Sequence, residues 1–430
     1  MESAGKWRTV WVHGAVCAGV LALVAAPVFT RGTGDWEQVY LTAANRLRTG
    51  GDVLALGSSY VYPPFGALFA VPFTFVSRTP GLIAWAIVNL VSVTVILCGA
   101  WRLTGGRGLP GRGGAGRGDL LAFWAGGFCA LGFLLDAAAN WQTDLIVAAL
   151  IVVGCTLTVG GRAITAGVAF GTAAAFKCTP LLFAGYLLWK RRFAGAVALL
   201  AVAIGLNVLP DLIYPPSDGV PRLVVWKERM LAPMAGKDYD PGMWASSVAY
   251  NHSLAGVNLR WFAFHRIEAN GQMITVARPD RLSATELTRL NLVLAAGLCL
   301  IALVAVWQRG NGRSESTVAE LGLVISLMLL LSPMSSKPHF GILLLPQLVL
   351  VRTAWANRDR FLYTLAGVNA VGGLCAGKDI VGRTAYEFLM WNGLVFWLTV
   401  NCFLGCAYTR WRYGRAETRV ECTKPPVNPS

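Results

Sequence analysis

The run GLIAWAIVNLVSVTVILCGAW, residues 81–101, contains no charged side chain and is long enough for one transmembrane helix. About 20 apolar residues in a helix cross the hydrocarbon core of a bilayer. Backbone polar groups have no water partners there, so such a run forms a helix, in which the backbone groups bond to each other. Similar blocks, separated by basic connectors, recur at residues 9–29, 120–139 and 291–307. The sequence therefore predicts an all-α, multi-pass membrane protein.

Composition supports this prediction, because 55% of the 430 residues are hydrophobic and only 14% are charged. Soluble chains carry about a quarter charged residues. The net charge of +15 suggests a nucleic-acid partner at first, but the basic residues lie at the ends of apolar blocks. That placement is the positive-inside pattern and favours membrane lipids, not nucleic acid, as the partner. The basic groups are Lys6 and Arg8, then residues 190–192, 352–360 and 410–415.

The ten cysteines lie almost entirely in apolar blocks, and the two long polar loops contain none. No Cys/His spacing typical of a metal site occurs, so we expect packing cysteines, no disulfide framework, no metal and no cofactor. The first apolar block admits two interpretations, a secretory signal or a retained helix. Its length exceeds that of a typical signal core and favours the retained helix.

The predicted organisation is a single transmembrane domain over residues 1–409, followed by a basic cytoplasmic tail over residues 410–430. Counting residues 63–77 as a span gives about twelve helices, but it puts the basic stretch 102–117 outside, against the charge rule. Alternatively, residues 63–77 form a half-helix on the outer face, which requires a re-entrant hairpin around Lys177. Both schemes place two loops, residues 30–62 and 211–290, on the same outer side.

Asp35 is the first candidate for chemistry, since it follows the first apolar block by a few residues. This position puts a carboxylate at the outer membrane surface, where the headgroup of an amphiphile lies. An ordinary loop acid or a helix N-cap is the alternative interpretation. Glu37 and Asp52 are competing acids in the same loop. Tyr62, in the run Tyr-Val-Tyr-Pro-Pro, marks the membrane interface by its aromatic ring.

Lys177 lies deep in the apolar stretch 163–189. An intramembrane lysine is costly and usually faces a cavity or a partner, although it can also snorkel to an interface. A second polar group lies between two apolar blocks and is most simply a loop with helix caps. It consists of Asp136, Asn140, Gln142 and Asp144.

Two further polar segments are candidates for binding a phosphate or a sugar. The turn 332–339, SPMSSKPH, joins two apolar blocks and combines hydroxyls with Lys337 and His339, although a single histidine in a turn is often structural. In the second long loop, Asn251 and Arg260 belong to a polar cluster next to Trp261. Indole rings pair well with sugar faces, but they also anchor loops at the bilayer.

These elements occur in a recognisable order: an acid after the first helix, Tyr-x-Tyr-Pro-Pro, Lys-x-x-Pro, Asn-x-Ser-Leu and Ser-Pro-x-Ser. Over about residues 10–350 the chain resembles the bacterial polyprenyl-phosphate-mannose-dependent α-mannosyltransferases, glycosyltransferase family 87 of the GT-C superfamily. The resemblance implies a GT-C fold whose two outer loops enclose the active site. It also implies that Asp35 is the general base.

The chain departs from the family pattern at four positions. Ser336 and Pro338 replace a Trp and the first of two His residues, so that only His339 remains of the pair. Trp141 replaces the Gly of a Gly-Gln pair, and His252 replaces the Gln of Asn-Gln-Ser. These departures bear on the donor sugar and the acceptor more than on the reaction type.

We therefore expect inverting transfer of a hexose, most simply mannose, from a polyprenyl-phosphate carrier to an extracytoplasmic glycolipid or glycan at the plasma membrane. Asp35 removes the proton of the acceptor hydroxyl. The side chains expected to bind the donor phosphate or sugar are Lys177, His339, Arg260, Lys337, Asn251 and Tyr62. A secondary transporter or lipid-linked sugar flippase is the alternative. Lys177 favours transport, whereas the absence of an evident internal repeat does not.

Overall fold

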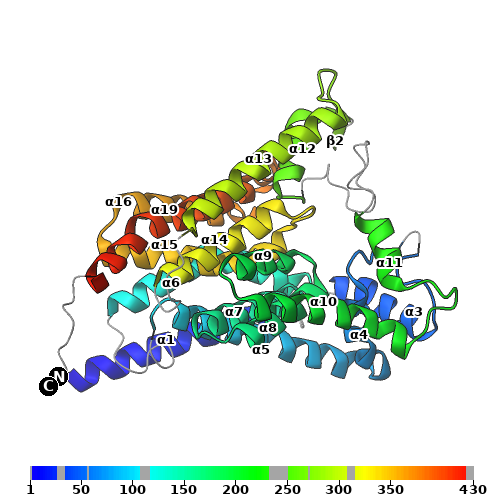
Figure 1. Cartoon of the computed structure of the whole chain (residues 1–430), viewed down its shortest axis with the longest axis horizontal. Coiled ribbons are helices and arrows are strands. Elements are labelled where there is room, and N and C mark those ends of the chain that lie inside the picture. The colour runs from blue at the N-terminus through cyan, green and yellow to red at the C-terminus, as the bar shows by residue number, and fades with distance from the viewer. Residues whose placement is uncertain are drawn as a thin grey trace.

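The structure is a computed structural model that describes residues 2–26, 34–55, 58–106, 117–231, 250–269, 272–307 and 315–422. Helices lying side by side make up nearly all of it, and α1 begins and α19 ends at the same side of the molecule (Figure 1). The longer helices are α1 (Glu2–Ala25), α5 (Arg78–Leu103), α6 (Arg117–Ala139), α7 (Asp144–Val159), α8 (Ala163–Phe176), α10 (Phe193–Ile213), α13 (Ala284–Ala305), α14 (Glu315–Leu331), α15 (Leu344–Asn357), α16 (Arg360–Cys375) and α19 (Leu394–Cys422).

Short helices connect these elements and build the polar end of the molecule. They are η1 (Trp36–Leu41), α3 (Thr42–Arg48), α4 (Pro64–Ala70), η2 (Val71–Phe75), η3 (Thr179–Leu181), α9 (Leu182–Trp189), α11 (Arg222–Trp226), η4 (Lys227–Leu231), α12 (Leu254–Phe262), η7 (Lys337–Leu343), α17 (Lys378–Val381) and α18 (Arg383–Trp391). Strands β1 (Phe264–Ala269) and β2 (Gln272–Ala277) form an antiparallel hairpin.

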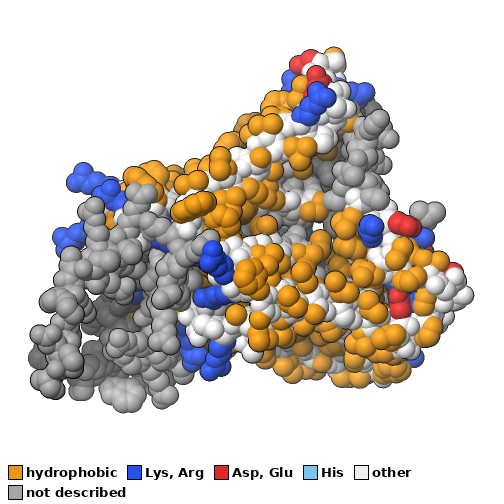
Figure 2. Space-filling view, in the orientation of Figure 1, with side chains coloured by type: hydrophobic (Ala, Val, Ile, Leu, Met, Phe, Trp, Pro, Cys, Tyr) orange, Lys and Arg blue, Asp and Glu red, His pale blue; other side chains and the backbone are white. Residues whose placement is uncertain are grey.

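The prediction of an all-helical membrane protein is confirmed. Within the described residues, five helical segments are long and apolar enough to cross a bilayer, and a sixth counts if α18 and α19, bent by 55°, form one span. Apolar helices of 10–17 residues supplement them. Orange side chains cover much of the visible face of the bundle (Figure 2). Exposed apolar side chains include Val197 on α10 and Leu292 on α13. The expected number of about twelve spans stays a prediction.

Helices α8 and α9 form a hairpin with Lys177 at its tip. The guanidinium of Arg192, after α9, donates to the carbonyl of Thr158 before α8 at 2.6 Å, so the hairpin begins and ends at the same end of the bundle. Helix α5 ends there too, because Trp85 near its start stacks on Trp36, next to Asp35 at the opposite end, and Gly99 near its end packs against Val152 of α7. Residues 102–106 therefore lie at this end, as in the second of the two topologies considered above. Residues 107–116 lie outside the described part of the chain.

Small residues allow the helices of this bundle to pack closely. A Cβ on Gly167 of α8 would meet the carbonyl oxygen of Gly195 of α10 at 2.1 Å, and a Cβ on Gly171 would meet that of Leu199 at 2.5 Å. Glycine lets two backbones approach in this way, and dispersion contacts then hold helices together in lipid. Close packing of α8 on α10 fixes the position of the hairpin tip.

Two features add to the predicted organisation. Within the predicted outer loop 211–290, β1 and β2 pair from Phe264 with Ala277 to Ala269 with Gln272. Helix α19 continues past residue 409, the predicted end of the membrane domain, to Cys422, and Arg410 is buried at 4% exposure. The Arg410 guanidinium pairs with the buried Glu320 of α14 at 2.8 Å, and such a carboxylate needs a cation inside the protein. Residues 423–430 of the predicted tail lie outside the described chain.

Candidate active site

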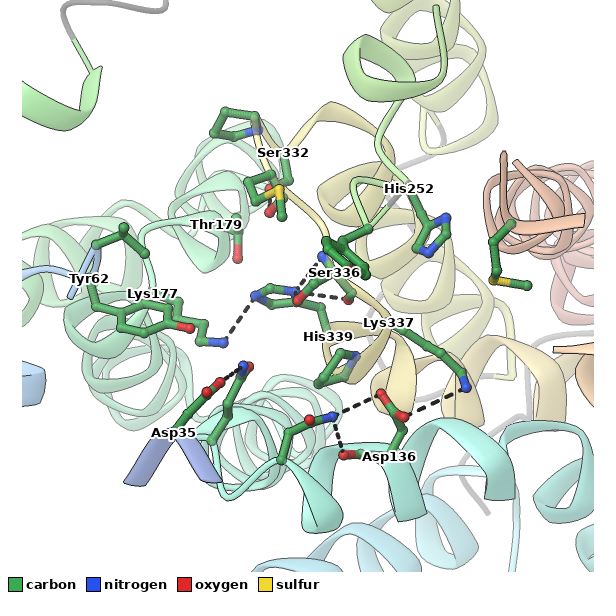
Figure 3. Close-up of a pocket in the computed structure, with 18 of the residues that line it drawn as sticks. Asp35, Tyr62, Asp136, Lys177, Thr179, His252, Ser332, Ser336, Lys337 and His339 are labelled. Carbon is green, nitrogen blue, oxygen red and sulfur yellow. Dashed lines mark hydrogen bonds and ion pairs between the residues drawn. The ribbon is translucent and has the colours of Figure 1, made fainter. Parts of the chain in front are cut away.

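A cavity of about 870 Å³ opens where α6, α8 and α14 end and where α7 and η7 begin. Both predicted outer loops reach it, since Asp35 and Tyr62 come from the first loop and His252 and Arg266 from the second. Figure 3 shows that polar side chains from several elements point into this space. Elements far apart in the sequence thus build one site at one end of the bundle.

Asp35 lies at the cavity and is held from two directions. Its backbone N–H donates to the carbonyl of Asn140 at 3.3 Å, and its Oδ2 accepts from Nε2 of Gln142 at 2.5 Å. The preceding Gly34 adopts a φ of +48°, and a Cβ there would lie 3.2 Å from the Asn140 carbonyl oxygen. Glycine is the residue that tolerates such a turn and so close an approach. The turn at Gly34 therefore sets Asp35 against the loop between α6 and α7.

Lys177, at the tip of the α8–α9 hairpin, is 5% exposed and forms a buried ion pair. Its Nζ donates to both carboxylate oxygens of Asp144 at 2.8 Å and lies 3.0 Å from Nε2 of His339. Asp144 is not among the cavity-lining residues, so the carboxylate supports the ammonium from behind. A lysine buried without such a partner would be strongly destabilising.

A local capping motif orients His339. Ser336 caps η7, and its backbone nitrogen lies 2.9 Å from Nδ1 of His339. Nδ1 also lies 3.0 Å from the Ser336 carbonyl oxygen. The ammonium of Lys177 can only donate, so Nε2 of the neutral ring accepts from it at 3.0 Å and Nδ1–H donates to the Ser336 carbonyl.

Lys337 and Tyr62 complete this part of the cavity. The ammonium of Lys337 is 3.6 Å from Oδ1 of Asp136, whose other oxygen accepts from Asn140 at 3.2 Å. The ring centroid of Tyr62 lies 4.8 Å from Nζ of Lys177, a cation–π contact. Burial raises the pKa of the Tyr62 phenol, which therefore stays protonated at neutral pH.

Asn251 and Arg260, predicted as ligand-binding residues, are fully buried and are not among the residues that line the cavity. The Asn251 side chain donates to the carbonyl of Pro333 at 2.9 Å and accepts from the amide of Ser335 at 3.2 Å. Arg260 donates to the carbonyls of Asn251 and Trp391. Burial lowers the pKa of Arg260 to about 10, so the guanidinium remains charged. Both residues hold the cavity wall from behind.

The competing acids of the first loop lie in other surroundings. Glu37 pairs with Arg78 at 2.8 Å, and Asp52 pairs with Arg229 at 2.5 Å. Neither lines the cavity. Among the candidates, Asp35, Tyr62, Lys177, Lys337 and His339 therefore come together. In the part of the chain that the structure describes, no group of three or more His, Cys, Asp or Glu side chains is placed to hold a metal ion.

The loop between α6 and α7 contributes more than helix caps, which is what the sequence suggested for it. Gln142 contacts Asp35, Asp144 pairs with Lys177, and Asp136 contacts Lys337. One sequence signal could have identified this loop. A lysine deep in an apolar stretch requires a nearby carboxylate, and Asp144 opens the next apolar block upstream.

The family match agrees with this arrangement. The model of glycosyltransferase family 87 matches residues 60–333, which is more than half of the chain. Among solved structures, the chain is similar to ArnT from Cupriavidus metallidurans in the apo state, with 13% identity, a TM-score of 0.41, and coverage of 95% of this chain and 77% of that chain. It is also similar to ArnT bound to undecaprenyl phosphate, with 13% identity, a TM-score of 0.39, and coverage of 97% and 82%.

A comparison with curated proteins gives no match. The family match covers the aromatic Tyr60–Tyr62 run, Lys177 and the Ser332–Pro333 turn, which are the elements that carried the resemblance in the sequence. The described part of the chain is a helical membrane bundle with a polar cavity at one end. The chain belongs to glycosyltransferase family 87 and is a membrane glycosyltransferase.

Proposed function

We propose that this enzyme transfers a hexose, mannose in the simplest case, from a polyprenyl-phosphate carrier to a hydroxyl of a glycolipid or glycan. The observation that carries the proposal is that the Asp35 carboxylate and the Lys177–His339 pair line one cavity at the end of the apolar helices. The polyprenyl tail of such a donor can stay in the bilayer while its sugar phosphate lies in the cavity.

Asp35 acts as the general base. In this mechanism the carboxylate takes the proton of the acceptor hydroxyl while the acceptor oxygen attacks C1 of the sugar. The bond between C1 and the phosphate oxygen breaks, its electron pair leaves with the polyprenyl phosphate, and the configuration at C1 inverts. Gln142 orients Asp35 through Oδ2. A base positioned in this way accelerates such a step by about 10²–10⁴-fold.

The leaving phosphate gains charge as the bond breaks and needs donors at that point. His339 Nε2 and Lys177 Nζ lie 3.0 Å apart, so a phosphate oxygen can accept from the Lys177 ammonium beside the imidazole, which donates as well once Nε2 carries a proton. Lys337, whose contact with Asp136 is long at 3.6 Å, supplies a second cation to the departing group. Tyr62 packs beside Lys177 and shapes the donor end of the cavity.

The charge distribution supports a plasma-membrane enzyme with an extracytoplasmic site. Lys190 and Arg192 flank the α8–α9 hairpin at the end of the bundle opposite the cavity, and Arg352 lies there beside Trp101. Basic residues collect on the cytoplasmic side of membrane proteins. The cavity would therefore face outward.

The direct test uses the purified protein in lipid nanodiscs with labelled polyprenyl-phosphate mannose, other polyprenyl-phosphate hexoses and nucleotide sugars. We expect a glycosylated product only with a lipid-phosphate donor, at an unchanged rate when a chelator is present. Product formation also separates a transferase from a transporter or flippase, which would move label without making a new bond. Transfer from a nucleotide sugar without carrier lipid, or complete loss of activity on chelation, would overturn the proposal.

A further inference from the structure

The cavity has a second wall that the proposed chemistry does not use. We call it the outer wall and define it by Arg266, Thr275, Tyr386, Glu387 and Trp391, all of which line the cavity. Arg266 and Thr275 lie directly opposite each other in the β1–β2 hairpin, so the same face of the hairpin presents both. The other three residues lie on α18.

The polar groups of the outer wall are paired with each other. Nη2 of Arg266 lies 3.2 Å from Oε2 of Glu387, and both side chains are partly exposed, at 20% and 30%. The pair offers planar donors beside an acceptor-only carboxylate, and this combination matches neighbouring hydroxyls that both donate and accept. The Arg383 guanidinium pairs with the same Glu387 at 2.9 Å from outside the cavity, so this carboxylate lies between two cations.

Aromatic rings surround this ion pair. The guanidinium of Arg266 lies 5.4 Å from the ring centroid of Trp391, and the ammonium of Lys337 lies 5.5 Å from that of Tyr386. Flat rings beside hydrogen-bonding groups provide an apolar surface with polar edges, which complements a pyranose ring with its C–H face and its hydroxyl rim. The single hydroxyl of a plain alcohol is the one that reacts, and an acyl chain has none. Neither would therefore provide hydroxyl partners for the Arg266–Glu387 pair.

Buried Arg260 connects the outer wall to the donor end of the cavity. Its Nε donates to the carbonyl of Trp391 at 2.9 Å, and its Nη1 donates to the carbonyl of Asn251 at 2.5 Å. Asn251 in turn holds the Ser332–Ser336 turn through Pro333 and Ser335. The outer wall is thus held at a fixed position relative to Lys337 and His339.

We infer that the outer wall is the acceptor subsite and that it binds a hexose ring, so that the acceptor is itself a glycoside. The inference rests on the proposed transfer reaction. The sugar of the acceptor lies against Trp391 and Tyr386, Arg266 and Glu387 bind two of its hydroxyls, and another hydroxyl points toward Asp35.

The experiment supplies labelled polyprenyl-phosphate mannose with octyl α-mannoside, octyl β-glucoside, octyl β-galactoside or 1-octanol as acceptor. We expect transfer to at least one octyl hexoside and none to 1-octanol, which has the same tail but no ring. Arg266→Gln, and separately Glu387→Gln, should raise the acceptor KM about 10-fold or more, as for a lost charge-assisted hydrogen bond, with the donor KM unchanged. Melting temperatures measured alongside establish that both variants are folded.

Arg383→Gln is the matched control. Arg383 pairs with the same Glu387 at 2.9 Å but does not line the cavity, and its side chain is 90% exposed. Its acceptor KM should stay within about twofold of wild type. Equal transfer to 1-octanol, or an unchanged acceptor KM for folded Arg266→Gln and Glu387→Gln, would overturn the acceptor subsite.

The two proposals fail in different ways. Release of mannose from the donor by water, with no transfer to any hexoside, would leave the donor chemistry intact and refute the acceptor subsite. No consumption of the donor under any condition would refute the proposed function instead.

Discussion

Asp35→Asn is the sharpest test of the catalytic assignment. The asparagine side chain keeps an oxygen that can accept from Gln142, so the 2.5 Å contact loses only its charge assistance. A hydrogen bond to a charged group is worth about 1.5–3 kcal/mol and a neutral one about 1 kcal/mol. The loss of stability should therefore be about 1–2 kcal/mol at most, and the variant should purify like wild type.

The expected loss of activity is larger. General base catalysis contributes about 10²–10⁴-fold, which equals roughly 2.7–5.4 kcal/mol of transition-state stabilisation. Initial rates of product formation from labelled donor lipid, measured in nanodiscs with saturating donor and acceptor, report kcat directly. We expect kcat to fall by at least about 100-fold while the donor KM changes little, since the carboxylate acts on the acceptor.

Glu37→Gln and Asp52→Asn are controls from the same loop. Each removes a carboxylate from a partly exposed ion pair, with Arg78 or Arg229, and neither carboxylate lines the cavity. Pairs of this kind contribute about 0–1 kcal/mol. Both variants should retain activity within about twofold. If Asp35→Asn keeps most of the wild-type rate while one control loses activity, the base has been assigned to the wrong residue.

Three further predictions follow from the geometry. Asp144→Asn leaves the buried Lys177 ammonium without a carboxylate, so thermal unfolding in detergent should show a destabilisation of about 3–5 kcal/mol, and an unchanged melting temperature would contradict the buried pair. His339→Gln or Lys337→Met should lower kcat by about 10–10³-fold with a smaller effect on donor affinity, and a change in melting temperature with normal turnover would make the residue structural. Burial, with Arg260 and Lys337 nearby, lowers the pKa of His252 to about 3 from an ordinary value of 6.5. Below pH 6.5 the His252 imidazole is protonated in the unfolded chain but stays neutral in the folded chain. This difference destabilises the fold by about 2 kcal/mol at pH 5. His252→Gln should remove this share of the acid sensitivity in melting curves at pH 7 and pH 5, and equal pH slopes for both proteins would refute the assignment.

The candidate residues that line the cavity could be predicted because each one lies where an apolar block ends. Asp35 and Tyr62 follow the first block, Lys177 interrupts another, and Lys337 and His339 occupy a turn between two more. Charged side chains are costly in lipid, so their positions in the sequence already mark the polar end of a bundle. Asn251 and Arg260 were predicted from another signal, a polar cluster beside Trp261 in the second loop, and they lie behind the wall, because composition does not distinguish a residue that lines a cavity from one that supports it.

The β1–β2 hairpin was missed in the expected outer loop, although the sequence contained a signal for it. Asn270 and Gly271 separate the paired residues Ala269 and Gln272, and Asn-Gly between alternating residues is the typical two-residue hairpin sequence. The continuation of α19 beyond residue 409 had no comparable signal. Arg410 in this part of the helix pairs with Glu320 of α14, 90 residues away in the sequence.

The sequence by itself determined that this chain is a helical membrane protein, because the length and apolarity of its blocks leave the backbone no other way to satisfy its hydrogen bonds in lipid. The resemblance to the family and five candidate residues that line the cavity also follow from the sequence. Which of these side chains contact each other depends on the tertiary structure. Gln142 is 107 residues from Asp35, and His339 is 162 residues from Lys177. Contacts at such separations follow from how helices pack, and close packing depends on the shapes of many side chains together, which no local pattern encodes.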